Sequence, residues 1–136
     1  MLKHISIKDI KVKKYRILCL VKVYDKNMFS TPELKLKLLS VCPSLNLHMC
    51  KNAANDSFEK ILDTTSLPHI LEHLIIDIQV SKSENSAEFT QAKFLGTTKW
   101  VDKKNGLAEI NINYFDDIVA LQAIKEAEDL LNHLLD

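Results

Sequence analysis

Residues 66–80 read SLPHILEHLIIDIQV and form the most strongly patterned stretch of the chain. Ser66 can cap the free amides of a first helical turn, and Pro68 is tolerated within that turn. The stretch then carries apolar residues three or four positions apart, the spacing of one helix face: Ile70, Leu71, Leu74, Ile75 and Ile78. We therefore expect a helix that runs to about Val80 and is buried on one side.

Stretches rich in β-branched and aromatic residues predict three strands around this helix. Tyr15–Tyr24 precedes the helix, and Phe89–Trp100 and Leu107–Tyr114 follow it. Between the last two lies Asn105-Gly106, which supplies the positive φ that a tight hairpin needs. These two strands are therefore predicted to pair antiparallel.

Three further helices are predicted from capping residues and periodicity. One opens at Ser30–Glu33 and stops at Pro43, and a short one covers Phe58–Leu62, with an extended piece at 45–50 between them. The last begins at Asp116-Asp117, where acidic residues favour a helix start, and has an apolar stripe: Ala120, Ala123, Ile124, Ala127, Leu130, Leu131 and Leu134.

Together these elements predict an α+β fold, an antiparallel or mixed sheet with about four helices packed on it. The 136 residues fit one domain of ordinary size, and a hydrophobic fraction of 46% is enough to build a core. No internal repeat or linker is visible. We expect residues 1–136 to form a single domain.

Composition excludes several classes of function. Lysine plus arginine equals aspartate plus glutamate, 18 each, which argues against a nucleic-acid binder that depends on bulk positive charge. With only two glycines, the chain has no glycine-rich loop to cradle a nucleotide phosphate. An ATP-dependent or NAD-dependent reaction on this chain alone is therefore not expected.

Location is predicted from three features. No apolar run is long enough to span a membrane, and Met1–Lys14 alternates lysine with apolar residues, unlike a signal peptide. Cys19, Cys42 and Cys50 are odd in number and widely spaced, which fits neither a disulfide framework nor a zinc knuckle. A reducing, cytoplasmic setting follows, with the thiols as buried or half-buried apolar groups.

The sequence His69-Ile70-Leu71-Glu72-His73 fits the pattern H-x-x-E-H, the inverted zinc-peptidase arrangement. Residues four apart on a helix lie one above the other, so His69 and His73 can converge on one zinc ion. Zinc makes a bound water acidic near neutral pH, and Glu72 can take its proton as the catalytic base. Asp77, one turn beyond His73, could orient an imidazole. The alternative is a partly buried helix whose histidines are structural.

A catalytic zinc needs a third protein ligand. Asp116 and Asp117 are the best candidates, because they begin the last helix on the line that continues into its apolar stripe. Glu126 and Glu128 fall off that stripe and are expected to be solvated. The remaining histidines are interpreted as surface or structural residues: His4, His48 and His133.

A longer set of residues resembles the N-terminal domain of cyanophycin synthetase. It comprises, in order, Pro43-Ser44-Leu45, His48-Met49-Cys50, Phe58, His69-x-x-Glu72-His73, Asp77-x-Gln79, Gly96-Thr97-Thr98, a strand ending at Tyr114, Asp116-Asp117 and a helix from Ala120 to Leu135. The similarity spans roughly residues 15–135. It departs from the family at 51–56, where a glycine-rich segment is expected, and at 81–93, where glycine and arginine are expected.

This resemblance implies a domain that binds the polymer cyanophycin. In some family members the domain resembles an M16-type metallopeptidase that cuts the polymer, with His69 and His73 as metal ligands, Glu72 as base, and Asp116 or Asp117 at the third position. These 136 residues hold no counterpart of the ATP-using domains of the synthetase, so we do not expect polymer synthesis by this chain alone. Two hypotheses follow: a zinc-dependent hydrolase acting on a peptide-like polymer, or a non-catalytic domain that binds a polymer or a partner synthetase subunit.

Overall fold

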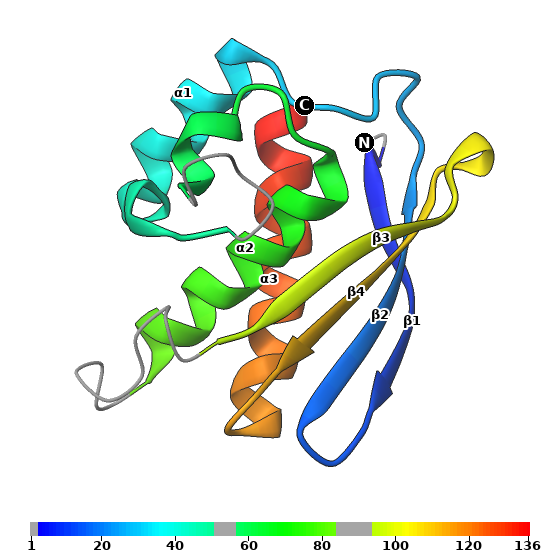
Figure 1. Cartoon of the computed structure of the whole chain (residues 1–136), viewed down its shortest axis with the longest axis vertical. Coiled ribbons are helices and arrows are strands. Elements are labelled where there is room, and N and C mark those ends of the chain that lie inside the picture. Colours follow the sequence, from blue (N-terminus) through cyan, green and yellow to red (C-terminus); the bar gives the residue numbers. More distant parts are fainter. Residues whose placement is uncertain (1–2, 51–56, 84–93) are drawn as a thin grey trace.

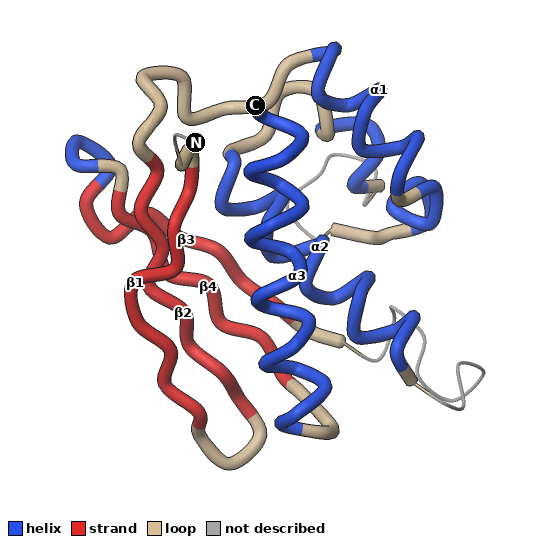
Figure 2. Tube along the Cα trace, turned by 180° about the vertical axis from the view of Figure 1, so that it is seen from behind, coloured by secondary structure: helices blue, strands red, loops and turns tan. Residues whose placement is uncertain are grey.

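The computed structural model of the chain describes residues 3–50, 57–83 and 94–136. Within them a four-stranded antiparallel sheet packs against three α-helices (Figures 1 and 2). The strands lie in the order β1-β2-β4-β3, so β1 and β3 form the two edges. Their bounds are Ile5–Val12 for β1, Arg16–Val23 for β2, Gly96–Asp102 for β3 and Leu107–Asn113 for β4.

Each α-helix begins at a residue whose side chain accepts backbone N–H groups, as expected from capping chemistry. Thr31 precedes α1 (Pro32–Val41), Ser66 precedes α2 (Leu67–Lys82) and Asp116 precedes α3 (Asp117–Leu135). Two 3-10 turns, η1 (Pro43–Leu47) and η2 (Phe58–Ile61), lie between α1 and α2 in the sequence.

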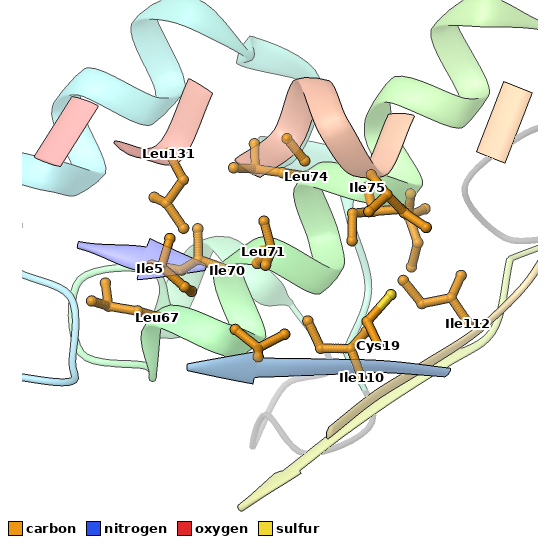
Figure 3. Close-up of a cluster of buried hydrophobic side chains, with 14 of the residues drawn as sticks. Ile5, Cys19, Leu67, Ile70, Leu71, Leu74, Ile75, Ile110, Ile112 and Leu131 are labelled. Carbon is orange, nitrogen blue, oxygen red and sulfur yellow. The ribbon is translucent and has the colours of Figure 1, made fainter. Parts of the chain in front are cut away.

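The core lies between the sheet and the layer formed by α2 and α3, while α1 packs on the outer side of that layer (Figures 1 and 2). The alternating residues of β2 and β4 turn their apolar side chains to this core. Figure 3 draws a cluster of the buried side chains and labels Ile5, Cys19, Leu67, Ile70, Leu71, Leu74, Ile75, Ile110, Ile112 and Leu131. The apolar face of α2 is thus fixed against the sheet, and its remaining side is available for polar residues.

The predicted α+β class and the antiparallel pairing are confirmed, with corrections in detail. The described residues form three α-helices rather than about four, because the short helix expected at Phe58 is a 3-10 turn. The piece expected to be extended at 45–50 begins inside η1. Strand β1 was not predicted, because five of its eight residues are exposed and its lysines hide the apolar pattern. Gly106 has the predicted positive φ, 70°.

Parts of the expected loop at 81–86 and of the strand starting at Phe89 lie outside the described residues. Residues 81 and 82, expected in the loop, are the last two residues of α2. The strand expected from Phe89 corresponds to β3, which begins at Gly96.

The two ends of the chain meet at one end of the molecule (Figure 1). His4 Nε2 lies 3.5 Å from Asp136 Oδ1, and the Asn132 side chain accepts the backbone N–H groups of His4 and Ile5. The last turn of α3 therefore anchors the beginning of β1. None of the helices in the described ranges combines the length and apolar character needed to cross a membrane.

Candidate metal centre

The first two turns of α2 carry the H-x-x-E-H residues on one side. The rings of His69 and His73 are neighbours, with centroids 4.8 Å apart and planes inclined by 73°. His73 and Glu72 are buried and His69 is half-buried. Because Ser66 caps the helix through the His69 N–H, the register of these residues is fixed at the helix start.

Each of these imidazoles uses its Nδ1 atom in a contact with another polar side chain. Thr65 Oγ1 lies 2.7 Å from His69 Nδ1, and His48 Nδ1 lies 3.0 Å from His73 Nδ1. The Nε2 atoms of both rings are consequently the atoms left to face a common ligand. This is the arrangement found around metal-binding histidines, whose second nitrogen is held by a neighbouring group.

Cys50 completes the group. Its Sγ lies 3.4 Å from His69 Nε2, and one donor atom from each of Cys50, His69 and His73 lies within 4.8 Å of the others. A bridge between Met49 and Ser57, with the Phe58 N–H donating to the His48 carbonyl, holds the segment that carries Cys50 against η2. A thiol and two imidazoles are a ligand set typical of zinc.

Glu72 lies at the side of this group, facing β3. Its carboxylate accepts a hydrogen bond from Thr98 Oγ1 at 2.6 Å, and its Oε2 atom lies 3.6 Å from His73 Nε2. Gly96 provides the space, because a Cβ atom there would lie 2.8 Å from Glu72 Oε2. The Gly96-Thr97-Thr98 segment therefore positions the carboxylate.

Burial disfavours the charged forms of these groups, and their pKa values shift accordingly. It lowers the pKa of His69 to about 4 and, with the neighbouring imidazoles, that of His73 to about 2. Burial also raises the pKa of Glu72 to about 7, while the Thr98 hydrogen bond opposes that rise. Neutral imidazole is the form that binds metal, so both histidines are in their ligand form at neutral pH.

Phe58 packs the imidazoles in place. Its ring stacks on His73 with a centroid distance of 3.8 Å and meets the His69 ring edge-on at 5.3 Å. Phe58 is itself fully buried. The ring orientations are therefore set by packing as well as by hydrogen bonds.

A surface pocket of about 400 Å³ borders the centre. Its wall includes His69 of the group and Thr98, the hydrogen-bond partner of Glu72. Most of the other lining residues are hydroxyl-bearing or aromatic, and an aliphatic and a basic side chain join them: Phe29, Ile61, Thr64, Thr65, Ser66, Lys99 and Trp100. A ligand in this pocket would contact the centre through His69.

The structure does not bring Asp116 and Asp117 to this centre. Both are exposed, and the Asp116 carboxylate accepts the N–H groups of Ile118 and Val119 as the cap of α3. Among the described residues, the group of possible ligands contains neither aspartate. The expectation that they lie near the buried face was wrong, because they precede the apolar stripe by one turn and serve the helix terminus.

The other predicted acidic residues are also engaged elsewhere. Glu126 pairs with Lys82 at 3.0 Å. Glu128 is buried, contrary to the solvated position expected, and accepts the Ile7 N–H at 2.7 Å. Asp77 does face an imidazole, but that of His48 rather than His73, at 3.1 Å from its Nε2.

Sequence reasoning missed the parts played by His48 and Cys50. His48 was interpreted as surface or structural, yet it is buried against His73, and Cys50 was treated as an apolar thiol. The spacing His48-x-Cys50 was the available signal, since it brings two further metal-binding residue types to one short segment. It did not show that the segment folds back onto α2.

These observations define the class of protein: a small α+β domain in which a cysteine and two histidines lie beside a buried glutamate. Comparison with protein families gives a match to the model of the cyanophycin synthase-like N-terminal domain over residues 18–136. The chain belongs to this family. A comparison with curated proteins gave no match.

Proposed function

We propose that this domain is a zinc-dependent hydrolase that cleaves amide bonds in a cyanophycin-like peptide polymer. Cys50, His69 and His73 would hold the metal, and Glu72 would act as the general base. The observation that carries the proposal is the convergence of these donor atoms within 4.8 Å of one another, beside a buried carboxylate.

The residues fit a zinc ion. Zinc–sulfur and zinc–nitrogen bonds of about 2.3 and 2.0–2.1 Å in a tetrahedron separate neighbouring donors by roughly 3.3–3.6 Å. The Cys50 Sγ to His69 Nε2 distance, 3.4 Å, already has this value. Three protein ligands also leave the open fourth position that a catalytic zinc requires.

Zinc bound there would lower the pKa of water to near 7 and polarise a carbonyl group. Glu72 would accept the proton of an attacking water as the new C–O bond forms. The same carboxyl can then donate that proton to the amide nitrogen as the C–N bond breaks. Thr98 holds the carboxylate during both steps through its hydroxyl hydrogen bond.

The pocket beside His69 and Thr98 supports a polymeric substrate. Its wall includes Thr98, Lys99 and Trp100 of β3, which is an edge strand of the sheet formed by the described residues. An extended peptide can pair with such an edge through main-chain hydrogen bonds. Lys99 lines the pocket and would attract a carboxylate of the polymer in competition with Glu109, whose Oε1 lies 3.7 Å from its Nζ.

The test is metal analysis and activity measurement on protein purified without a histidine tag. We expect about one zinc per chain, loss of zinc in Cys50→Ala, and cyanophycin cleavage that a chelator abolishes. Glu72→Gln should keep zinc but lower the turnover by about 10²–10⁴-fold. Glu33→Gln, whose side chain is 81% exposed on α1, is the matched control and should behave as wild type. Zinc-free protein, or unchanged cleavage in Glu72→Gln, would reject the proposal.

Burial of the centre favours a second candidate, a non-catalytic polymer-binding or subunit-assembly domain. Glu72 is 4% exposed and His73 is 2% exposed, whereas a catalytic group must meet its substrate. Under this alternative the histidines and Phe58 form a structural cluster. It predicts polymer binding or co-purification of a synthetase subunit without any cleavage, and a cleavage rate that depends on Glu72 would overturn it.

A further inference from the structure

Three side chains outside the proposed ligand set form a hydrogen-bonded line that ends at His73. Ser44 Oγ donates to Asp77 Oδ1 at 2.5 Å, and the same oxygen lies 3.1 Å from His48 Nε2. The other nitrogen of His48, Nδ1, lies 3.0 Å from His73 Nδ1. The line joins the start of η1 to α2 across the segment that carries His48.

The Asp77 carboxylate determines which atom donates in each hydrogen bond of this line. An ionised carboxylate only accepts hydrogen bonds, so His48 Nε2 must carry a proton and donate it to Asp77. A neutral imidazole has one N–H, which leaves His48 Nδ1 as an acceptor. His73 Nδ1 must then be the donor to His48, and the single proton of neutral His73 is on that atom.

We propose that Asp77, acting through His48, fixes His73 in the Nδ1–H tautomer and so keeps the lone pair of His73 Nε2 free for a metal ion. His48 and Asp77 are thus positioning residues, and we call Asp77, His48 and His73 the tautomer relay. The part of this inference that concerns metal affinity rests on the proposed function. The tautomer itself does not.

The relay explains the burial of His48, which the ligand set alone does not require. His48 is 2% exposed, and its ring lies between Asp77 and the His73 ring, with a ring-centroid distance to His73 of 5.2 Å. Which nitrogen of a histidine binds a metal is set by the hydrogen bond that the other nitrogen makes. Without the relay, His73 would be free to place its proton on Nε2, where it blocks coordination.

The direct test is the tautomeric state of the histidines in metal-free protein. Two-bond ¹H–¹⁵N correlation spectra at pH 8, above the ordinary imidazole pKa of about 6.5, distinguish Nδ1–H from Nε2–H rings. We expect His73 as the Nδ1–H form and His48 as the Nε2–H form, with the signals assigned by comparison with His48→Gln and His73→Gln. A His73 ring protonated on Nε2, or exchanging between the two forms, overturns the proposal. If those variants do not fold, the two rings are assigned instead through their own backbone resonances in the wild-type protein, so the wild-type spectrum still decides the question.

The second test is the zinc affinity of two variants. Asp77→Ala should show both His73 tautomers and bind zinc about 10–100-fold more weakly, the effect usual for loss of such a partner. Ser44→Ala, which removes the other contact of the same oxygen but leaves the relay, is the control and should bind zinc as wild type does. Unchanged affinity in Asp77→Ala overturns the claim that the relay supports binding.

The outcomes separate the two proposals. An Nδ1–H His73 in a protein that binds no zinc would reject the proposed function and leave the tautomer relay standing. Zinc binding by a protein whose His73 is in the Nε2–H form when metal-free would do the reverse.

Discussion

Gly96 and Glu72 lie so close together that no residue larger than glycine fits at position 96. A Cβ atom at Gly96 would lie 2.8 Å from Glu72 Oε2 and 3.0 Å from the carboxyl carbon. Gly96 does not have a positive φ, so it is the space rather than the backbone conformation that requires glycine here. The first residue of β3 thereby sets where the carboxylate of α2 can lie.

Gly96→Ala should lower the free energy of unfolding by about 1–3 kcal/mol, the cost typical of overpacking. The added methyl group must displace the Glu72 carboxyl and weaken its hydrogen bond from Thr98. Urea unfolding measures the change. In a Glu72→Ala background the same substitution should be neutral or stabilising, because alanine suits a strand better than glycine. An equal cost in both backgrounds would show that Glu72 is not the obstacle.

Stability of the metal-free protein should fall as the pH is lowered from about 6 to 5. His69 and His73 have folded pKa values of about 4 and 2, below the ordinary 6.5, so the unfolded chain binds two more protons in this window. Glu72, with a folded pKa of about 7 against 4.5, holds one proton more when folded. The net difference of one proton gives a slope of about 1.4 kcal/mol per pH unit.

Glu72→Gln should roughly double that slope, because it removes the only one of the three groups that gains a proton on folding. Urea unfolding at a series of pH values, with a chelator present, gives both slopes. A slope that is unchanged in Glu72→Gln would mean that Glu72 titrates normally in the folded protein.

Thr98→Val should raise the pKa of Glu72 further. The hydroxyl hydrogen bond stabilises the charged carboxylate and opposes the rise caused by burial, so its loss leaves burial unopposed. The ¹³C chemical shift of the Glu72 carboxyl, followed against pH in metal-free protein, measures this directly. Thr97→Val, on the exposed side of the same strand, is the control. A lower pKa in Thr98→Val would contradict the assignment.

Phe58→Ala should destabilise the protein by about 3–5 kcal/mol, as expected for removing a fully buried aromatic ring. The ring is 0% exposed and stacks on His73 at 3.8 Å, so its loss leaves a cavity against the imidazoles. Thermal unfolding compares this variant with Leu36→Ala, whose side chain on α1 is 72% exposed and whose loss should have little effect. Similar stabilities of the two variants would argue against a packing role for Phe58.

The sequence predicts α2 and its neighbours well because several local signals agree there. Ser66 supplies the cap, Pro68 fits the first turn, and the apolar spacing continues to the end of the helix. The same agreement holds for the hairpin at Gly106, whose positive φ only a few residue types tolerate. These features depend on neighbours in the chain and are visible in a single sequence.

The composition of the centre could be predicted only in part because it depends on distant segments. The spacing of His69 and His73 is a local property of a helix and was sufficient to place them together. Cys50 and His48 lie beside these histidines because of the bridge between Met49 and Ser57. No periodic pattern in the sequence predicts that bridge. Asp116 and Asp117 were favoured because they lie on the line that continues into the apolar stripe of the last helix, although a helix terminus is a sufficient reason for an acidic residue.

The two ends of the chain meet through His4 and Asp136. The same architecture could therefore be built with its segments in a different order along the polypeptide. A short linker could join these ends, and new ends could be opened in the exposed hairpin at 103–105, giving a circularly permuted protein with the same packed layers. In such a permutant β1, β2 and the helices would be synthesised in a different order while the centre on α2 kept every contact. Its refolding rate would then report how far assembly of the centre depends on the way its parts are connected along the chain.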